Sequence, residues 1–249
     1  LHDLTIQSGQ GIENSTGALA INTGEFSGRS PQDRFIVKDS ITEDKVWWGN
    51  VNIPFEPAAF DALYTKVTAY LSKKEVFVRD TYVCADPNYR LNVRVVTETA
   101  WSNLFCFNMF LRPEIEELDD FTAEWSVICA PHFEADPAVD GTRQSNFAII
   151  DFTRKIALIG GTGYTGEIKK GIFSALNFIL PVFKNTLPMH CSANVGEDGD
   201  TAIFFGLSGT GKTTMALDCF GDRRCFSVQC LSQRKNIPEC RRKNSFNCF

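Results

Sequence analysis

A glycine-rich stretch at residues 206–214, GLSGTGKTT, has the residue types needed to hold nucleotide phosphates. Its spacing, Gly206-x-x-x-x-Gly211-Lys212-Thr213, is the phosphate-binding loop pattern. The glycines let backbone N–H groups turn towards one anion, while the lysine supplies a point charge to the β- and γ-phosphates and the threonine hydroxyl can bind Mg²⁺. The predicted nucleotide site comprises Ser208, Gly209, Thr210, Gly211, Lys212, Thr213 and Thr214.

The segments on either side of this loop have the character that the motif requires. Residues 202–205 form an apolar run that predicts a buried strand, and residues 213–217 can open a helix. A helix that begins at a bound phosphate adds the partial positive charge of its N-terminus. This strand–loop–helix context favours nucleotide binding over a plain glycine turn.

Strand-like and helix-like segments alternate upstream of the loop, which predicts an α/β fold. We expect a mixed α/β amino-terminal domain followed by the start of a nucleotide-binding domain. The predicted helices cover residues 57–74, 101–113 and 167–183. The predicted strands cover residues 17–24, 34–39, 75–86, 91–99, 124–131, 147–152, 155–161, 189–196 and 201–206.

Composition and charge narrow the class of protein. Hydrophobic residues make up 43% and charged residues 22% of the 249, as in ordinary soluble proteins. A net charge of −5 gives no electrostatic reason to expect nucleic acid or an anionic membrane, and no apolar run approaches the ~20 residues that span a bilayer. Cys84, Cys106, Cys129 and Cys191 stand singly among apolar residues, which predicts buried free thiols of a cytoplasmic protein.

The composition changes after the phosphate loop. Residues 215–249 carry seven Lys/Arg, three Asp/Glu and five cysteines, with no C-x-x-C pair that would suggest a zinc site. We therefore expect a substrate-side domain over 1–185, the start of the nucleotide-binding domain over 186–214, and an aberrant tail over 215–249 that a shift of reading frame would explain. Because position 1 is not methionine, we expect the sequence to be a fragment.

Five further segments resemble ATP-dependent phosphoenolpyruvate carboxykinases, in that family's order. They are FSGRSPQDRF (26–35), ADPNYRLNVRVV (85–96), WSNLFCFNMFLRP (101–113), GGTGYTGEIKKGIFSALN (160–177) and MHCSANVG (189–196). With the phosphate loop, the resemblance covers nearly all of residues 1–214. It implies conversion of oxaloacetate and ATP to phosphoenolpyruvate, ADP and CO₂ in gluconeogenesis, by an enzyme expected to be monomeric.

The resemblance also implies roles for individual residues. Arg29 matches the arginine that holds the substrate carboxylate and CO₂, and Tyr164 matches a tyrosine near the substrate. Lys170 and His190 match two Mn²⁺ ligands, and Lys170 is also expected at the substrate. Taken alone, an arginine after a glycine turn indicates a solvated surface residue, and a histidine in an apolar strand indicates a structural one.

The nucleotide side completes the implied site. Lys170 and Lys212 are the expected catalytic residues, and Thr213 is expected to bind Mg²⁺ beside ATP. The role of Lys169 stays open. Asp33 and Arg34 are predicted to form local structural pairs.

One departure from the family pattern weakens the expected metal site. Family members carry an acidic pair about fourteen residues after the phosphate loop, where one aspartate completes the Mn²⁺ site. The corresponding positions here are near Phe226 and Ser227. We therefore expect the chain to be inactive as written. The alternatives are a different phosphate-loop kinase acting on a small metabolite, or a non-catalytic truncated product.

Overall fold

The computed structural model describes residues 1–195, 200–207, 210 and 225–228. The chain divides into two compact units, each of which is described by itself. The first comprises residues 1–82 and 91–175, and the second comprises residues 83–90 and 176–249. The division falls within helix α5 (Gly166–Lys184).

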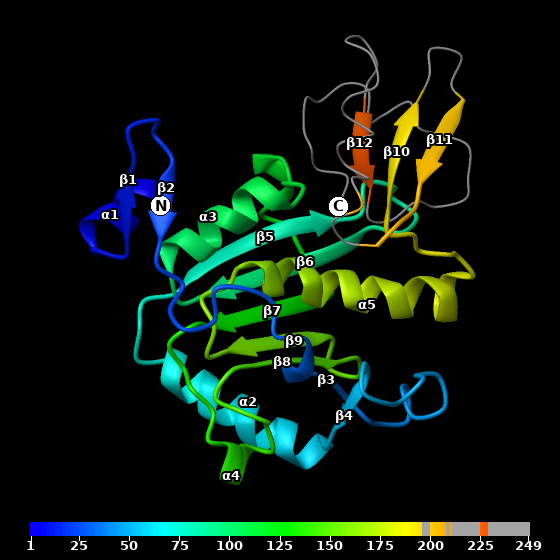
Figure 1. The fold of residues 1–249 in the computed structure, drawn as a ribbon, viewed down its shortest axis with the longest axis horizontal. Helices are drawn as coiled ribbons and strands as arrows, with labels where there is room; N and C mark the ends of the chain where they lie inside the picture. Colours follow the sequence, from blue (N-terminus) through cyan, green and yellow to red (C-terminus); the bar gives the residue numbers. More distant parts are fainter. Residues whose placement is uncertain (196–199, 208–209, 211–224, 229–249) are drawn as a thin grey trace. The chain divides into compact units, whose positions relative to one another are not determined.

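A seven-stranded, largely parallel sheet forms the centre of the first unit (Figure 1). Its order is β4-β3-β8-β9-β7-β6-β5. Parallel pairs join β4 to β3, β3 to β8, β9 to β7 and β7 to β6, whereas β8 and β9 are antiparallel. The strands are β3 (Arg34–Val37), β4 (Ile53–Phe55), β5 (Phe77–Val83), β6 (Leu91–Thr97), β7 (Trp125–Ala130), β8 (Phe147–Asp151) and β9 (Ile156–Gly160).

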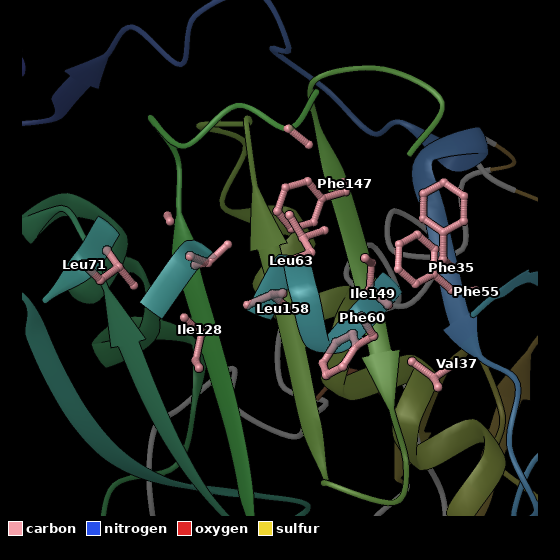
Figure 2. Close-up of a cluster of buried hydrophobic side chains, with 13 residues drawn as sticks. Phe35, Val37, Phe55, Phe60, Leu63, Leu71, Ile128, Phe147, Ile149 and Leu158 are labelled. Carbon is pink, nitrogen blue, oxygen red and sulfur yellow. The ribbon is translucent and has the colours of Figure 1, made fainter. Parts of the chain in front are cut away.

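Helix α2 (Pro57–Leu71) covers one face of this sheet. Its buried residues Phe60, Leu63, Val67 and Leu71 follow the helical repeat, as the sequence predicts. They pack against alternate residues of the strands, including Ile128, Phe147, Ile149 and Leu158, as Figure 2 shows. Burying each such side chain contributes about 2 kcal/mol, so this cluster is a main source of the unit's stability.

The opposite face of the sheet receives the start of α5. Leu158 of β9 lies in the α2 core, so Ala157 points the other way. A Cβ placed on Gly171 of α5 would lie 3.4 Å from the Ala157 Cβ, which is ordinary packing distance. Phe35 of β3 also lies in the α2 core, so Arg34 points to the α5 face. This alternation brings a charged strand residue to the same face as α5.

A three-stranded antiparallel sheet belongs to the second unit. Its middle strand is β10 (Cys191–Val195), flanked by β11 (Thr201–Phe204) and β12 (Cys225–Val228). Among the described residues, β11 is therefore an edge strand, and Ile203 and Phe205 are exposed on it and just after it.

The remaining elements are short, apart from α3 (Ala100–Met109). They are α1 (His2–Gln7), β1 (Gly11–Glu13), β2 (Leu19–Ile21), α4 (Pro137–Asp140) and the 3₁₀ turns Pro31–Asp33 and Ile115–Glu117. The mixed α/β class and the predicted long helices and strands are confirmed. The four cysteines predicted to be buried thiols are buried and free. No helix in the described part of the chain is long and apolar enough to span a bilayer.

Candidate functional site

The turn that joins β9 to α5 is built from glycines that admit no side chain. Gly161 has φ +66°, and a Cβ there would lie 2.4 Å from the carbonyl oxygen of Ser145. A Cβ on Gly163 would lie 2.7 Å from the Thr23 carbonyl oxygen. Both contacts are to backbone atoms, which cannot rotate away. The glycines therefore let this turn touch two other loops, one of which leads to Arg29.

The loop that carries Arg29 is held at both ends. Its beginning lies against Gly163 through Thr23. Its end is fixed by Asp33, which is 1% exposed and accepts hydrogen bonds from Arg143 Nε and Nη2 at 2.9 and 2.8 Å and from Gln144 at 2.7 Å. Charge-assisted pairs of this bidentate kind fix direction as well as distance. Arg29 itself is exposed on the loop between these anchors.

A second bidentate pair ties β3 to the first turn of α5. Arg34 donates from Nε and Nη2 to the two carboxylate oxygens of Glu167, at 2.9 and 2.7 Å. The partners of Asp33 and Arg34 lie 110 and 133 residues away, so the prediction of pairs is confirmed but the prediction that they are local is wrong. Sequence distance hid these contacts because only the sheet brings the partners together.

Lys170 is a buried cation within this arrangement. It is 9% exposed, and its Nζ lies 4.8 Å from the centroid of the Phe173 ring. Burial lowers the pKa of Lys170 to about 8, and the positive charges of Arg29, Lys169 and Arg34 act in the same direction, against Glu167. A lysine in this state gives up its proton readily, so it can present a neutral nitrogen to an electrophile or cation.

Lys169 belongs to the same group of charges. Burial lowers its pKa, and so does the charge of Arg29. Arg29, Lys169 and Lys170 thus influence one another, although Arg29 is about 140 residues away in sequence. Glu167 is the carboxylate that offsets them, and it is already paired with Arg34. The net positive charge suits a small dianion.

Tyr164 lies at the entrance to the helix. Its backbone N–H donates to the Thr162 hydroxyl at 3.1 Å, and its carbonyl accepts from the N–H of Glu167 at 3.1 Å. A Cβ on Gly166 would lie 2.7 Å from the Tyr164 hydroxyl oxygen, so the absence of a side chain there makes room for the phenol. The turn therefore holds Tyr164 directly before the helix that carries Lys169 and Lys170.

The predicted nucleotide and metal residues of the second unit are only partly described. His190 is exposed immediately before β10. Thr210 is exposed, and its hydroxyl donates to the Leu207 carbonyl at 2.8 Å. The other predicted members of the phosphate loop lie outside the described residues: Ser208, Gly209, Gly211, Lys212, Thr213 and Thr214. The strand predicted before the loop is present as β11, but the prediction that it is buried is wrong, because the first three of its residues are exposed.

The described residues contain no group of three or more His, Cys, Asp or Glu side chains that could hold a metal ion. This does not bear on Lys170, whose nitrogen is the kind of donor that a divalent cation accepts once the proton is lost.

Two supporting residues were missed by sequence reasoning. Glu167 lies three positions before Lys170, so helical spacing alone places both on one face of α5, and this signal was available. Arg143 had no signal, because nothing in the sequence connects it to Asp33.

Comparison with known proteins identifies the family. The family model described as phosphoenolpyruvate carboxykinase matches residues 1–222. The chain belongs to the ATP-dependent phosphoenolpyruvate carboxykinase family. Curated relatives with the name phosphoenolpyruvate carboxykinase (ATP) come from Flavobacterium johnsoniae, 84% identical over 218 residues, and from Christiangramia forsetii, 72% identical over 218 residues. A relative with the same name from Geobacillus kaustophilus is 52% identical over 219 residues.

These matches cover 88% of the chain but 41% of each of the three relatives. The chain thus spans less than half the length of the phosphoenolpyruvate carboxykinases that it matches.

Proposed function

We propose that the chain supplies the substrate side and the phosphate loop of an enzyme that converts oxaloacetate and ATP to phosphoenolpyruvate, ADP and CO₂. The observation that supports this most directly is the grouping of Arg29, Lys169 and Lys170 in the first unit. Oxaloacetate is a small dianion, and a partly buried group of cations binds such a ligand by charge-assisted hydrogen bonds.

The residues of the first unit have distinct parts in this proposal. The Arg29 guanidinium binds a substrate carboxylate and orients the bond that breaks when CO₂ leaves. Loss of CO₂ leaves negative charge on the remaining enolate, which the positive charges of Arg29 and Lys169 stabilise electrostatically. The enolate oxygen then attacks the γ-phosphoryl group of ATP, in line with the departing ADP. Tyr164 lines the entrance of the same site.

Metal binding is part of the proposal. We propose Lys170 and His190 as ligands of Mn²⁺, and Thr213 as a ligand of Mg²⁺. The low pKa of Lys170 supports this, because a lysine binds a cation only as the neutral amine. When bound, a divalent cation supplies Lewis-acid stabilisation of charge that develops on oxygen.

The nucleotide part rests on the sequence motif. Lys212 offers its ammonium to the β- and γ-phosphates, where charge spreads during transfer. The proposed contacts to ATP also include Ser208, Gly209, Thr210, Gly211 and Thr214 through the loop.

We further propose that the 249 residues alone do not complete the reaction. The expected metal-binding aspartate corresponds to a position near Phe226 and Ser227, and neither residue type provides a carboxylate. A role in gluconeogenesis, a cytoplasmic location and a monomeric full enzyme are proposed on the family resemblance.

Calorimetric titration of oxaloacetate into the chain tests the substrate site. Arg29→Gln should weaken binding about tenfold, which corresponds to one charge-assisted hydrogen bond. Lys73→Gln, which removes an exposed cation just after α2, should not. Equal affinity in wild type and Arg29→Gln would contradict the substrate assignment.

Turnover is tested separately by phosphoenolpyruvate release with ATP and Mn²⁺. Robust release by the chain would contradict its proposed inactivity while supporting the reaction. In that case Lys212→Met should abolish release.

A further inference from the structure

Outside the candidate site, two arginines meet at one aromatic ring. The Arg79 Cζ, on β5, lies 4.9 Å from the centroid of the Phe107 ring on α3. The Arg112 Cζ lies 4.2 Å from the same centroid. Both distances fall within the range of cation–π attraction, which contributes about 0.5–1 kcal/mol for each exposed contact. One ring therefore gathers two guanidinium groups.

Backbone pairing brings Arg79, Phe107 and Arg112 close together. β5 is the last strand of the seven-stranded sheet, and the chain after α3 runs beside it. The Tyr82 N–H donates to the Leu111 carbonyl at 2.8 Å, and the Leu111 N–H donates back at 3.1 Å. This two-way backbone pairing holds Arg112, the next residue, alongside the edge strand that carries Arg79.

A buried amide fixes the direction of Arg79. Asn103, which is 1% exposed, accepts a hydrogen bond from Arg79 Nε at 2.8 Å and donates to the Phe77 carbonyl at 3.1 Å. Asn103 and Phe107 are four residues apart on α3, so they share one face of the helix. The guanidinium is therefore oriented through Nε, which leaves its other N–H groups available to a ligand.

The charges of Arg79 and Arg112 lie close enough to act on each other. Burial lowers the pKa of Arg79, and the charge of Arg112 lowers it further. Within the described ranges, neither guanidinium forms an ion pair. Arginine keeps its charge at all physiological pH values, so the repulsion persists until an anion offsets it.

Three acidic residues close to these arginines in the sequence bond to other groups. Asp80, directly after Arg79, pairs with Arg94. Glu114 and Glu117 form the capping box of the turn at Ile115–Glu117, where each side chain accepts from a backbone N–H. One of these bonds joins the Glu114 N–H to Glu117 at 2.7 Å. These two carboxylates bond to the backbone of the turn.

We propose that Arg79, Phe107 and Arg112 form a binding site for a phosphate group, carried by a small molecule or free in solution. A phosphate presents several oxygens in different directions, so it can accept hydrogen bonds from more than one guanidinium at once. A planar carboxylate matches a single guanidinium fork better. The site is independent of the proposed substrate site, and nothing in it depends on the carboxykinase reaction.

Arginine side-chain NMR of the chain labelled with ¹⁵N at Nε tests the site directly, with inorganic phosphate as the probe. Arg79→Lys and Arg112→Lys assign the two signals. Both signals should move together with one dissociation constant of about 1 mM. Arg112→Gln should weaken the affinity reported by Arg79 about fivefold or more. Arg94→Gln, which removes an arginine already paired with Asp80, should leave the affinity unchanged.

Three results would overturn the proposal. The first is that neither signal moves up to about 20 mM phosphate, a concentration well above the expected constant. The second is unchanged affinity in both Arg112→Gln and Phe107→Leu, each checked for an intact fold by the other arginine signals. The third is equal affinity for succinate, which would assign the site to carboxylates. A phosphorylated metabolite that binds at least tenfold more tightly than phosphate would identify the source as a small molecule and support the site.

Discussion

Glu167 on α5 accepts two parallel hydrogen bonds from the guanidinium of Arg34 on β3, at 2.9 and 2.7 Å. The pair joins the first turn of the helix to a strand whose next residue, Phe35, lies in the core on the other face of the sheet. The helix that carries Lys169 and Lys170 is thereby fixed to the element that follows Arg29.

Glu167→Gln should destabilise the protein. The substitution removes the charge that matches Arg34 and leaves a partly buried guanidinium with a weaker partner, at a cost of about 2 kcal/mol. Urea unfolding measures this loss. Glu43→Gln, at an exposed position, is the matched control. A loss below about 0.5 kcal/mol would show that the pair is of the weak surface kind.

The pKa of Lys170 should move in opposite directions in two variants. Arg29→Gln removes a neighbouring positive charge, so the pKa should rise from about 8 towards the ordinary lysine value of 10.5. Glu167→Gln removes the carboxylate that raises this pKa, so the pKa should fall. The ¹³Cε chemical shift of Lys170, followed against pH in the presence of a chelator, reports both. Movement in the same direction in both variants would contradict the described charge arrangement.

The buried Glu98 should contribute to stability at neutral pH and lose that contribution in acid. Burial acts to raise its pKa, but hydrogen bonds from Lys74 at 2.5 Å, Tyr70 at 2.6 Å and the His132 N–H at 3.0 Å outweigh burial and hold the pKa below 4.5. The stabilisation is therefore complete above pH 4.5 and disappears as the pH falls through the lowered value.

Glu98→Gln should accordingly cost about 2 kcal/mol at pH 7 and flatten the fall in stability on the acid side. Thermal unfolding between neutral and acid pH measures both effects. Glu75→Gln, an exposed carboxylate near the same end of α2, provides the control. If the stability of Glu98→Gln fell towards acid pH as steeply as that of the wild type, the acid sensitivity would come from other carboxylates.

Substitution of two glycines allows the loss of stability from a left-handed backbone to be measured separately from the loss caused by crowding. Gly9 has φ +71° and open space where a Cβ would lie, whereas Gly161 has φ +66° and a Cβ position 2.4 Å from the Ser145 carbonyl oxygen. Gly9→Ala should cost about 1 kcal/mol, which is the backbone strain alone. Gly161→Ala should cost at least about 2 kcal/mol more, because backbone must shift. Similar losses in urea unfolding would mean that the turn has room to adjust.

The long elements could be predicted from the sequence because their patterns are complete. Phe60, Leu63, Val67 and Leu71 define one helical face without help from the rest of the chain. β4, with three residues, and α4, with four, are too short to show a period, and contact with neighbouring elements decides them.

The candidate site also contains residues that local sequence predicts and residues that only the fold brings together. Arg29, Tyr164 and Lys170 are identified by short motifs, so local sequence suffices for them. The supports of these residues come from elsewhere: Arg143 reaches Asp33 across 110 residues, and only strand order makes that contact possible. The lowered pKa of Lys170 could not be predicted from local sequence either, because burial and the charge of Arg29 lower it.

The contact of Gly163 with the Thr23 carbonyl has a consequence for how the site can vary. The two segments meet through main-chain atoms, and main chain has no rotamers to exchange. Substitutions around them can change side-chain volume without changing the separation of the two loops. Most substitutions near these loops should therefore leave the spacing between the Arg29 loop and the Tyr164 turn unchanged. That spacing requires glycine at position 163, because any side chain there would meet the Thr23 carbonyl.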